Sequence, residues 1–235
     1  MSISRKDGRT YHFDFSPGTT SDDRINREWW NDMYDMERII HTEKLDGENT
    51  CLNGIGIFAR SHAAPTRHPW SSFLKPKFSM IQNDLKENNI ELFGENIYAI
   101  HSIIYPNIEN HFYIFGVRIL DKWLSWEEVQ WYADFFEYPT VPVIGEHQVP
   151  LITKDSVKEY VIEEASKPSA FGSLQNGLKP KPCTMEGIVT RNVDEYDVKE
   201  MSYNIFKYVR KGHVQTDEHW SKNWKRAPLK WEKNK

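Results

Sequence analysis

The dipeptide Asn53-Gly54 constrains the fold most, because it stands between two apolar runs, Thr50–Leu52 and Ile55–Phe58. Asn-Gly favours the left-handed backbone conformations that a two-residue turn between antiparallel strands requires. A dipeptide of this kind between apolar segments is the strongest short signal of a β-hairpin. The sequence therefore predicts an antiparallel pair of strands at this point, and a fold that contains antiparallel sheet.

The rest of the chain alternates between strand-like and helix-like patterns. Ser125-Trp126-Glu127-Glu128 reads as a capping box, and the apolar residues that follow it recur with helical spacing. Further helical spacing occurs at 77–88 and 154–166, and strand-like runs occur at 91–99, 111–120, 185–191 and 204–210. Short strands intermixed with helices predict an α+β fold in which helices flank antiparallel sheets.

Length and composition favour a single globular domain over residues 1–235. Hydrophobic residues make up 39% of the chain and aromatic residues 14%, so a sizeable core can form. Two cysteines, Cys51 and Cys183, are too few for a disulfide framework, and neither has the spacing of a zinc ligand. No apolar run is long enough for a signal peptide or a membrane span. We therefore expect a cytoplasmic protein without a membrane partner.

Charge is distributed unevenly along the chain. Its net charge is −4, but residues 207–235 hold nine Lys and Arg against three acids, and residues 60–77 hold four basic residues and no acid. A basic C-terminal extension from about residue 213 suits contact with phosphates on an otherwise acidic body. A solvated tail without a partner is the alternative.

Five short motifs follow one another in a fixed order and carry the chemistry. A lysine, a carboxylate and a glycine turn make up the first of them, and a single match of this kind would be weak. The ordered set is more specific: Lys44-Leu45-Asp46-Gly47, Leu92–Asn96, Phe112–Phe115, Glu186–Val189 and Phe206–Arg210.

This order resembles that of the covalent nucleotidyltransferases, the polynucleotide ligases and capping enzymes that attach a nucleoside monophosphate to a lysine. The phrasing is most similar to that of the ATP-dependent RNA ligases, in the branch of phage RNA ligase 2 and the RNA-editing ligases. The resemblance spans about residues 40–212. It implies an α+β nucleotidyltransferase fold, the ATP-grasp-like adenylation domain of ligases, in which antiparallel sheets surround an ATP cleft.

The resemblance also implies roles for the first three motifs. Lys44 would attack the α-phosphate of ATP and form a lysyl-AMP phosphoramidate, so the site must favour its neutral amine. Asp46 would contact the ribose or help to hold the metal region, and Arg60 would contact the nucleotide or the RNA end. Glu95 would accept hydrogen bonds from the ribose hydroxyls. Phe115 would stack on adenine, whereas Phe112 is expected in the core.

The last two motifs would bind metal and phosphate. Glu186 matches the carboxylate expected to bind the catalytic divalent ion, Mg²⁺ or Mn²⁺, directly or through water. Lys207 matches a lysine that contacts the α-phosphate. The alternatives for these groups are ordinary surface charges or structural ion pairs.

The chain departs from the family pattern at two positions. Gly116 follows the stacking phenylalanine where RNA ligases of this branch usually have an aspartate. Val209 stands where a second lysine usually follows the first, two residues along the strand. We expect the missing cation to be absent or supplied by Arg210 or Lys211.

The function implied is that of an AMP-forming, ATP-dependent RNA ligase, in which AMP passes from Lys44 to a 5′-phosphate end and a 3′-hydroxyl then seals the break. RNA ends are the expected partners, and we expect a monomer. Only 25 residues follow Arg210, too few for the OB domain of capping enzymes and most DNA ligases. A DNA ligase-like core that seals nicks and an inactive module that binds nucleotide or RNA ends remain the alternatives.

Overall fold

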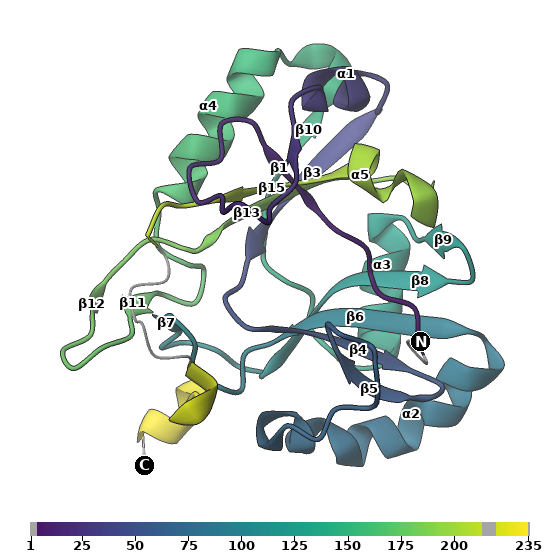
Figure 1. The fold of residues 1–235 in the computed structure, drawn as a ribbon, viewed down its shortest axis with the longest axis vertical. Coiled ribbons are helices and arrows are strands. Elements are labelled where there is room, and N and C mark those ends of the chain that lie inside the picture. The colour runs from purple at the N-terminus through teal and green to yellow at the C-terminus, as the bar shows by residue number, and fades with distance from the viewer. Residues whose placement is uncertain (1–3, 213–219, 235) are drawn as a thin grey trace.

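The computed structural model describes residues 4–212 and 220–234. Two six-stranded sheets lie one above the other in Figure 1, with a small three-stranded sheet at one side. In spatial order the first sheet contains β10 (Val143–Gln148), β3 (Arg38–Lys44), β13 (Gly187–Asn192), β15 (Ile205–Val209), β1 (Tyr11–Phe13) and β2 (Ile25–Asn26). The second contains β14 (Tyr196–Asp197), β9 (Lys122–Trp123), β8 (Phe112–Ile119), β6 (Ile90–Asn96), β4 (Glu48–Asn53) and β5 (Gly56–Ala59). The third contains β12 (Lys181–Pro182), β11 (Leu174–Gln175) and β7 (Ile103–Ile104).

The predicted hairpin is present as β4 and β5. Asn53 pairs with Gly56, so the two turn residues are Gly54 and Ile55 rather than the expected Asn53 and Gly54, and neither Asn53 nor Gly54 has a positive φ. The side-chain oxygen of Asn53 accepts hydrogen bonds from the backbone N–H groups of Ile55 (3.0 Å) and Gly56 (3.2 Å). An asparagine side chain that mimics a backbone turn in this way stabilises a tight connection. The hairpin forms the edge of the second sheet, immediately after the strand that carries Lys44.

The pairing in the sheets is antiparallel with one exception. β1 pairs in parallel with both β15 and β2 and so adds the N-terminal segment to the edge of the first sheet. The sequence analysis did not predict these two strands, because a segment of two or three residues carries no recognisable alternation.

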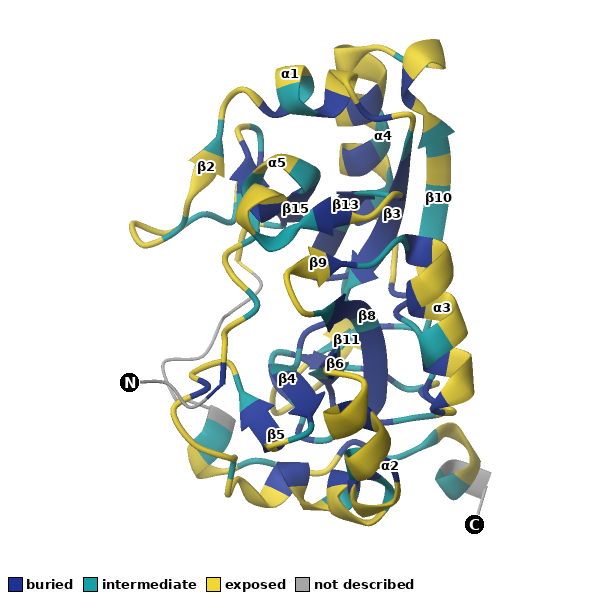
Figure 2. Cartoon of the chain, turned by 90° about the vertical axis from the view of Figure 1, so that its right-hand side faces the viewer, coloured by how far each residue is buried: buried dark blue, intermediate teal, exposed yellow. Residues whose placement is uncertain are grey.

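Helices cover the outer faces of the sheets, and the three predicted ones are confirmed as α2 (Lys75–Glu87), α3 (Trp126–Phe135) and α4 (Lys154–Ala165). α3 begins at the predicted capping box, in which the Ser125 hydroxyl accepts from the N–H of Glu128 and the Glu128 carboxylate accepts from the N–H of Ser125. The short helices α1 (Trp29–Tyr34) and α5 (Met201–Asn204) were not predicted. Figure 2 shows that each long helix turns an exposed face outward, while the central strands are buried.

Separate apolar clusters hold the two halves of the molecule. α1 and α4 pack on the first sheet around Trp29 and Phe206, whereas α2 and α3 pack on the second sheet around Leu92 and Phe112. Phe112 is fully buried, which confirms its predicted place in the core. A third cluster joins the sheets through Phe93 and Trp123 on one side and Ile205 on the other, so both apolar and polar side chains line the space between the sheets.

The C-terminal extension packs against the segment 97–111 that connects β6 to β8. Its first part, 213–219, lies outside the described residues. The N–H of Ala227 donates to the carbonyl of Tyr98 (2.8 Å), Ala227 is buried, and the Trp224 ring lies 6.0 Å from the Tyr98 ring. The described part of the extension is therefore packed on the body. Within the described ranges no helix has the length and apolar character needed to cross a membrane.

Candidate active site

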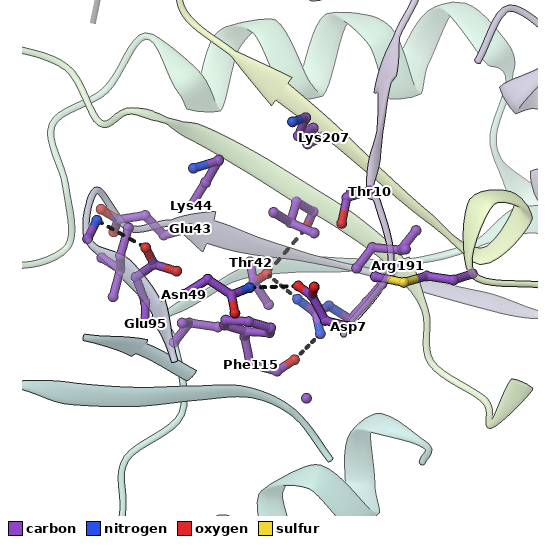
Figure 3. A pocket seen from close by; sticks show the side chains of 18 of the residues that line it. Asp7, Thr10, Thr42, Glu43, Lys44, Asn49, Glu95, Phe115, Arg191 and Lys207 are labelled. Atoms are coloured by element: carbon purple, nitrogen blue, oxygen red, sulfur yellow. Dashed lines mark hydrogen bonds between the residues drawn. The ribbon is translucent and has the colours of Figure 1, made fainter. Parts of the chain in front are cut away.

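A cavity of about 600 Å³ opens between the two large sheets. One wall is a face of the first sheet, where Thr42 lies opposite Val189, and Val189 lies opposite Lys207 on the next strand. Since alternate residues of a strand face the same side, Lys44 and Arg191 share this face. All five line the cavity, as Figure 3 shows for the four that it labels. The register of three strands thus gathers cations that are far apart in the sequence.

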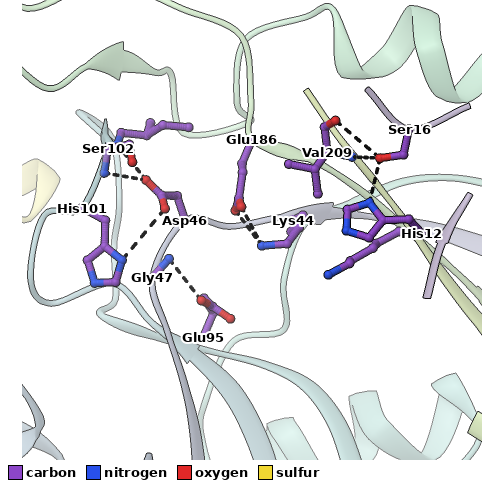
Figure 4. A network of polar contacts seen from close by, with 12 residues as sticks. His12, Ser16, Lys44, Asp46, Gly47, Glu95, His101, Ser102, Glu186 and Val209 are labelled. Atoms are coloured by element: carbon purple, nitrogen blue, oxygen red, sulfur yellow. Dashed lines mark hydrogen bonds and ion pairs between the residues drawn. The ribbon is translucent and has the colours of Figure 1, made fainter. Parts of the chain in front are cut away.

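Lys44 and Glu186 form an ion pair beside this wall: Lys44 lines the cavity and its side chain is 27% exposed, whereas Glu186 is buried and is not among the lining residues. The Lys44 amine lies 2.8 Å from each Glu186 carboxylate oxygen, and Glu186 directly precedes Gly187, which pairs with Lys44 (Figure 4). Burial lowers the pKa of Lys44, but Glu186 and Glu95 outweigh it, so the pKa is raised above its usual value. We expected a site that favours the neutral amine. The ligand-free arrangement instead holds Lys44 protonated, because carboxylates surround it.

Glu95 reaches into the cavity from β6 in the second sheet. Its carboxylate accepts a hydrogen bond from the N–H of Gly47 at 3.1 Å (Figure 4) and therefore lies beside the turn that follows Lys44. Burial raises the pKa of Glu95 to about 8, and the nearby carboxylates of Glu186 and Asp46 add to the increase. A cation between these carboxylates would relieve that repulsion.

Phe115 faces the cavity because β8 contains a bulge. Gly116 pairs with Phe93 and Ile114 pairs with Gly94, so Phe115 is the extra residue, without a partner on β6. A bulge changes the direction of a side chain in this way. Phe115 is half-buried and lines the cavity, whereas Phe112 on the same strand is in the core.

Gly116 leaves room for a tryptophan ring where the family usually has an aspartate. A Cβ at Gly116 would lie 3.0 Å from Cζ3 of Trp123. A carboxylate enters this part of the cavity from the N-terminal segment instead, because Asp7 lines it and accepts a hydrogen bond from the Asn49 amide at 2.7 Å. Burial raises the pKa of Asp7. The sequence analysis missed Asp7, which lies outside every motif.

Lys207 lines the cavity, but the two residues expected to supply the second cation do not. The Arg210 guanidinium donates to the side-chain oxygen of Gln175 at 3.1 Å, and neither Arg210 nor Lys211 is among the lining residues. Val209 is buried against the N-terminal segment. The structure therefore does not bring Arg210 to the other site residues.

Arg60 is the cation that the structure does place near Lys207. It is exposed at the end of the hairpin and lines both the main cavity and a second cavity of about 480 Å³. Lys207 lines both cavities as well, and the positive charge of Arg60 contributes to lowering the pKa of Lys207. Arg60 thus lines both cavities together with Lys207, and its contact with the nucleotide or the RNA end stays a prediction.

Asp46 is directed away from the cavity. One of its carboxylate oxygens accepts hydrogen bonds from the backbone N–H groups of Ser102 (2.7 Å) and Ile103 (2.8 Å), as Figure 4 shows for Ser102. Asp46 does not line the cavity, although Leu45 and Gly47 on either side of it do. These contacts fix the loop beside Lys44, and a contact between Asp46 and the ribose or metal stays a prediction.

Arg191 is a buried cation that the sequence analysis did not single out. Its guanidinium donates to the carbonyl oxygen of Phe115 and lies 5.1 Å from the Trp126 ring. Among the described residues, its Nε has no hydrogen-bond partner. Burial lowers the pKa of Arg191 to about 10. Arg191 lies two residues after Val189 on the strand that follows Glu186, and alternate residues of a strand face the same side. This spacing is the signal in the sequence that could have identified Arg191.

Comparison with known proteins identifies the family of the chain. The family model described as RNA ligase matches residues 37–209, which is well over half of the chain and includes the first four motifs and the fifth as far as Val209. The chain belongs to the RNA ligase family. No curated protein sequence matches it significantly.

Solved structures similar to this RNA ligase family member include three of the Naegleria gruberi RNA ligase. An apo mutant has a TM-score of 0.52, at 18% identity over 86% of this chain and 58% of that one. Two other mutants, both with ATP and Mn, have TM-scores of 0.53 and 0.50 at 18% identity, over 88% and 86% of this chain. They confirm the nucleotidyltransferase fold. The chain spans 60% and 59% of their lengths.

Proposed function

We propose that the chain is an ATP-dependent, AMP-forming RNA ligase with Lys44 as the covalent nucleophile. The observation that carries the proposal is the position of the Lys44 amine, 2.8 Å from both oxygens of Glu186. Of this pair, Lys44 lines the cavity, together with Glu95, Phe115 and Lys207. Membership of the RNA ligase family supports the same assignment.

The reaction would proceed in three transfers. The neutral amine of Lys44 attacks the α-phosphorus of ATP, a P–N bond forms, and the bond to the β-phosphate oxygen breaks to release pyrophosphate. A 5′-phosphate oxygen of an RNA end then takes the AMP and frees Lys44. A 3′-hydroxyl finally attacks that 5′-phosphorus, and AMP leaves. Lys207 and Arg60 would hold the phosphate charges during these displacements.

The residues of the site fit a divalent metal. Within the described ranges no three acidic, histidine or cysteine side chains form a complete metal site, so Mg²⁺ or Mn²⁺ would also need oxygens from phosphate and water, as Mg²⁺ commonly does. Glu186 is the residue that would hold it, with Glu95 close by. When bound, the ion would neutralise phosphate charge. If Glu186 bound the ion, its attraction for the Lys44 ammonium group would weaken, and this would favour the neutral amine of Lys44.

Label transfer tests the proposal directly. The purified chain is mixed with ATP labelled in the α-phosphate and Mg²⁺, and acid-stable label on the polypeptide is measured. Lys44→Ala should abolish the label, and Lys44→Arg should fail too, because a guanidinium stays protonated. Lys158→Ala, on the exposed side of α4, is the matched control and should retain the label. Labelling of Lys44→Ala at the wild-type level would exclude Lys44 as the nucleophile.

Two alternatives are separated by the same preparation. An inactive module that binds nucleotide or RNA ends would give no label with the wild-type chain. Nicked duplexes with RNA or DNA strands at the break, joined by labelled enzyme, distinguish an RNA ligase from a DNA ligase-like core. We expect RNA ends to be joined faster than DNA ends.

A further inference from the structure

The N-terminal segment 11–26 lies before the residues that match the RNA ligase family, yet it lines the second cavity, which shares Lys207 with the reaction cavity. β1 pairs in parallel with β15, and in that register His12 lies opposite Lys207. His12 is almost completely buried, and its Nδ1 lies 2.8 Å from the hydroxyl of Ser16, which accepts a hydrogen bond from the N–H of Val209 (Figure 4). The segment is therefore anchored to the strand that carries Lys207.

Asp23 in this segment contacts Lys207 directly. One oxygen of the Asp23 carboxylate lies 3.3 Å from the Lys207 amine and 3.1 Å from Nε2 of His12. The other accepts hydrogen bonds from the backbone N–H (3.0 Å) and the hydroxyl (2.9 Å) of Thr20. The side chains of Asp23 and Lys207 are 25% and 17% exposed, so both lie partly out of water. Both carboxylate oxygens are thus held, and Asp23 has a defined orientation toward Lys207.

The Asp23–Lys207 ion pair lies where the two cavities meet at Lys207. Lys207 lines the reaction cavity and also the second cavity, whereas Asp23 lines the second cavity alone. A phosphate that enters the reaction cavity would approach Lys207 on the side opposite to Asp23. Lys207 can then keep its carboxylate partner while it donates to phosphate, because an ammonium group has three donors.

We propose that Asp23 is a positioning residue, which keeps the amine of Lys207 charged and directs it into the reaction cavity. This rests on the proposed function, in which Lys207 binds the phosphates of the nucleotide. Asp23 supplies a negative charge in contact with Lys207, whose neighbours Lys44 and Arg60 are cations. It would act through Lys207 and touch no reacting atom.

The charges around Lys207 explain why such a partner is needed. Lys207 faces His12 from β1, Lys44 from β3, Arg60 from the end of the hairpin and Asp23 from its own segment. Burial, Lys44 and Arg60 lower the pKa of Lys207, whereas Asp23 raises it. Burial lowers the pKa of His12 to about 4, so His12 is neutral at pH 7 and adds no positive charge. Without Asp23, Lys207 would lose its proton at lower pH.

The experiment measures the pH dependence of Lys44 adenylylation in the full chain with Asp23→Asn. The initial rate and the KM for ATP are followed from about pH 6 to about pH 10.5, a range that spans the ordinary lysine pKa. The alkaline limb of the rate should move down by about one pH unit, since removal of an adjacent opposite charge shifts a pKa by about 1–3 units. Above this limb the rate should be about tenfold below wild type, and the KM for ATP should rise with it.

Two variants separate positioning from a structural effect. Asp22→Asn removes the neighbouring carboxylate, whose side chain forms no ion pair among the described residues, and should keep the wild-type profile. Asp23→Glu restores a carboxylate and should recover most of the shift. Melting temperatures of all variants are compared, because a purely structural role of Asp23 would lower the melting temperature and the rate but leave the limb in place.

Each outcome is decisive. A shifted limb with Asp23→Asn alone supports the proposal. A wild-type profile for Asp23→Asn, or an equal shift with Asp22→Asn, overturns it. Absence of label on the wild-type chain would contradict the proposed function instead, so the two failures are distinguishable.

Discussion

Replacement of Phe115 by leucine tests whether its ring stacks on the adenine base. The side chain lies at a bulge and is half-buried in the cavity wall, so leucine keeps apolar bulk there but removes the aromatic face. Stacking of a base on an aromatic side chain contributes about 1–3 kcal/mol. Phe115→Leu should therefore weaken ATP binding by about 5- to 150-fold, while Phe115→Trp should bind nearly as well as wild type.

The assay is titration calorimetry with ATP in a Lys44→Ala background, where no covalent step follows binding. Phe112→Leu is the matched control, because Phe112 lies three residues earlier on the same strand and is fully buried. That change should lower the free energy of unfolding by about 1 kcal/mol and leave ATP affinity unchanged. The stacking assignment would be refuted if Phe115→Leu bound ATP as tightly as the protein that retains Phe115, or if Phe112→Leu lost as much ATP affinity as Phe115→Leu.

Three further predictions follow from the site and its surroundings. Glu186→Gln removes the main carboxylate that raises the pKa of Lys44. In metal-free protein, an amine-acylating reagent should therefore modify Lys44 at lower pH in this variant than in wild type, as measured by mass spectrometry. An unchanged pH profile of modification would contradict the ion pair. Gly116→Asp should lower the melting temperature without a gain in adenylylation rate, because a side-chain Cβ at this position would lie 3.0 Å from the Trp123 ring. A higher adenylylation rate would contradict this and would mean that the variant had regained the function of the family aspartate. Burial lowers the pKa of His41 from 6.5 to about 3, so His41 stabilises the fold fully above pH 6.5 and this contribution is lost as the pH falls toward 3. In chemical denaturation, the free energy of unfolding of His41→Asn should fall less steeply than that of wild type across this window, by up to about 1.4 kcal/mol per pH unit. Equal slopes for the two proteins would exclude this role.

Local patterns in the sequence predicted most of the regular structure. The hairpin at Asn53-Gly54, the capping box at Ser125 and the helical spacing at 77–88 each depend on residues within a few positions of one another, and each is confirmed, although the turn residues of the hairpin are Gly54 and Ile55. Interactions of this range are present in the local sequence itself, which is why they can be read without a structure. The ordered motifs likewise identified the family, because their residue types and order are properties of the sequence.

Only the tertiary structure determined how the motif residues meet. Lys44 and Glu186 are 142 positions apart, and their contact depends on the pairing of β3 with β13, which no local pattern specifies. The bulge that turns Phe115 inward depends on a register shift between two strands. Asp46 and Arg210 match the family motifs but find other partners, Ser102 and Gln175.

The sequence by itself determined the fold class, the family and the residue types available for the chemistry, since these depend on short-range patterns and motif order. The tertiary structure alone decided which charges surround each functional group. Lys44 is held protonated by carboxylates from other strands, and Lys207 depends on Asp23 from a segment that carries no motif. Electrostatic interactions depend on distance in space and on burial, and neither quantity is contained in the order of residues along the chain.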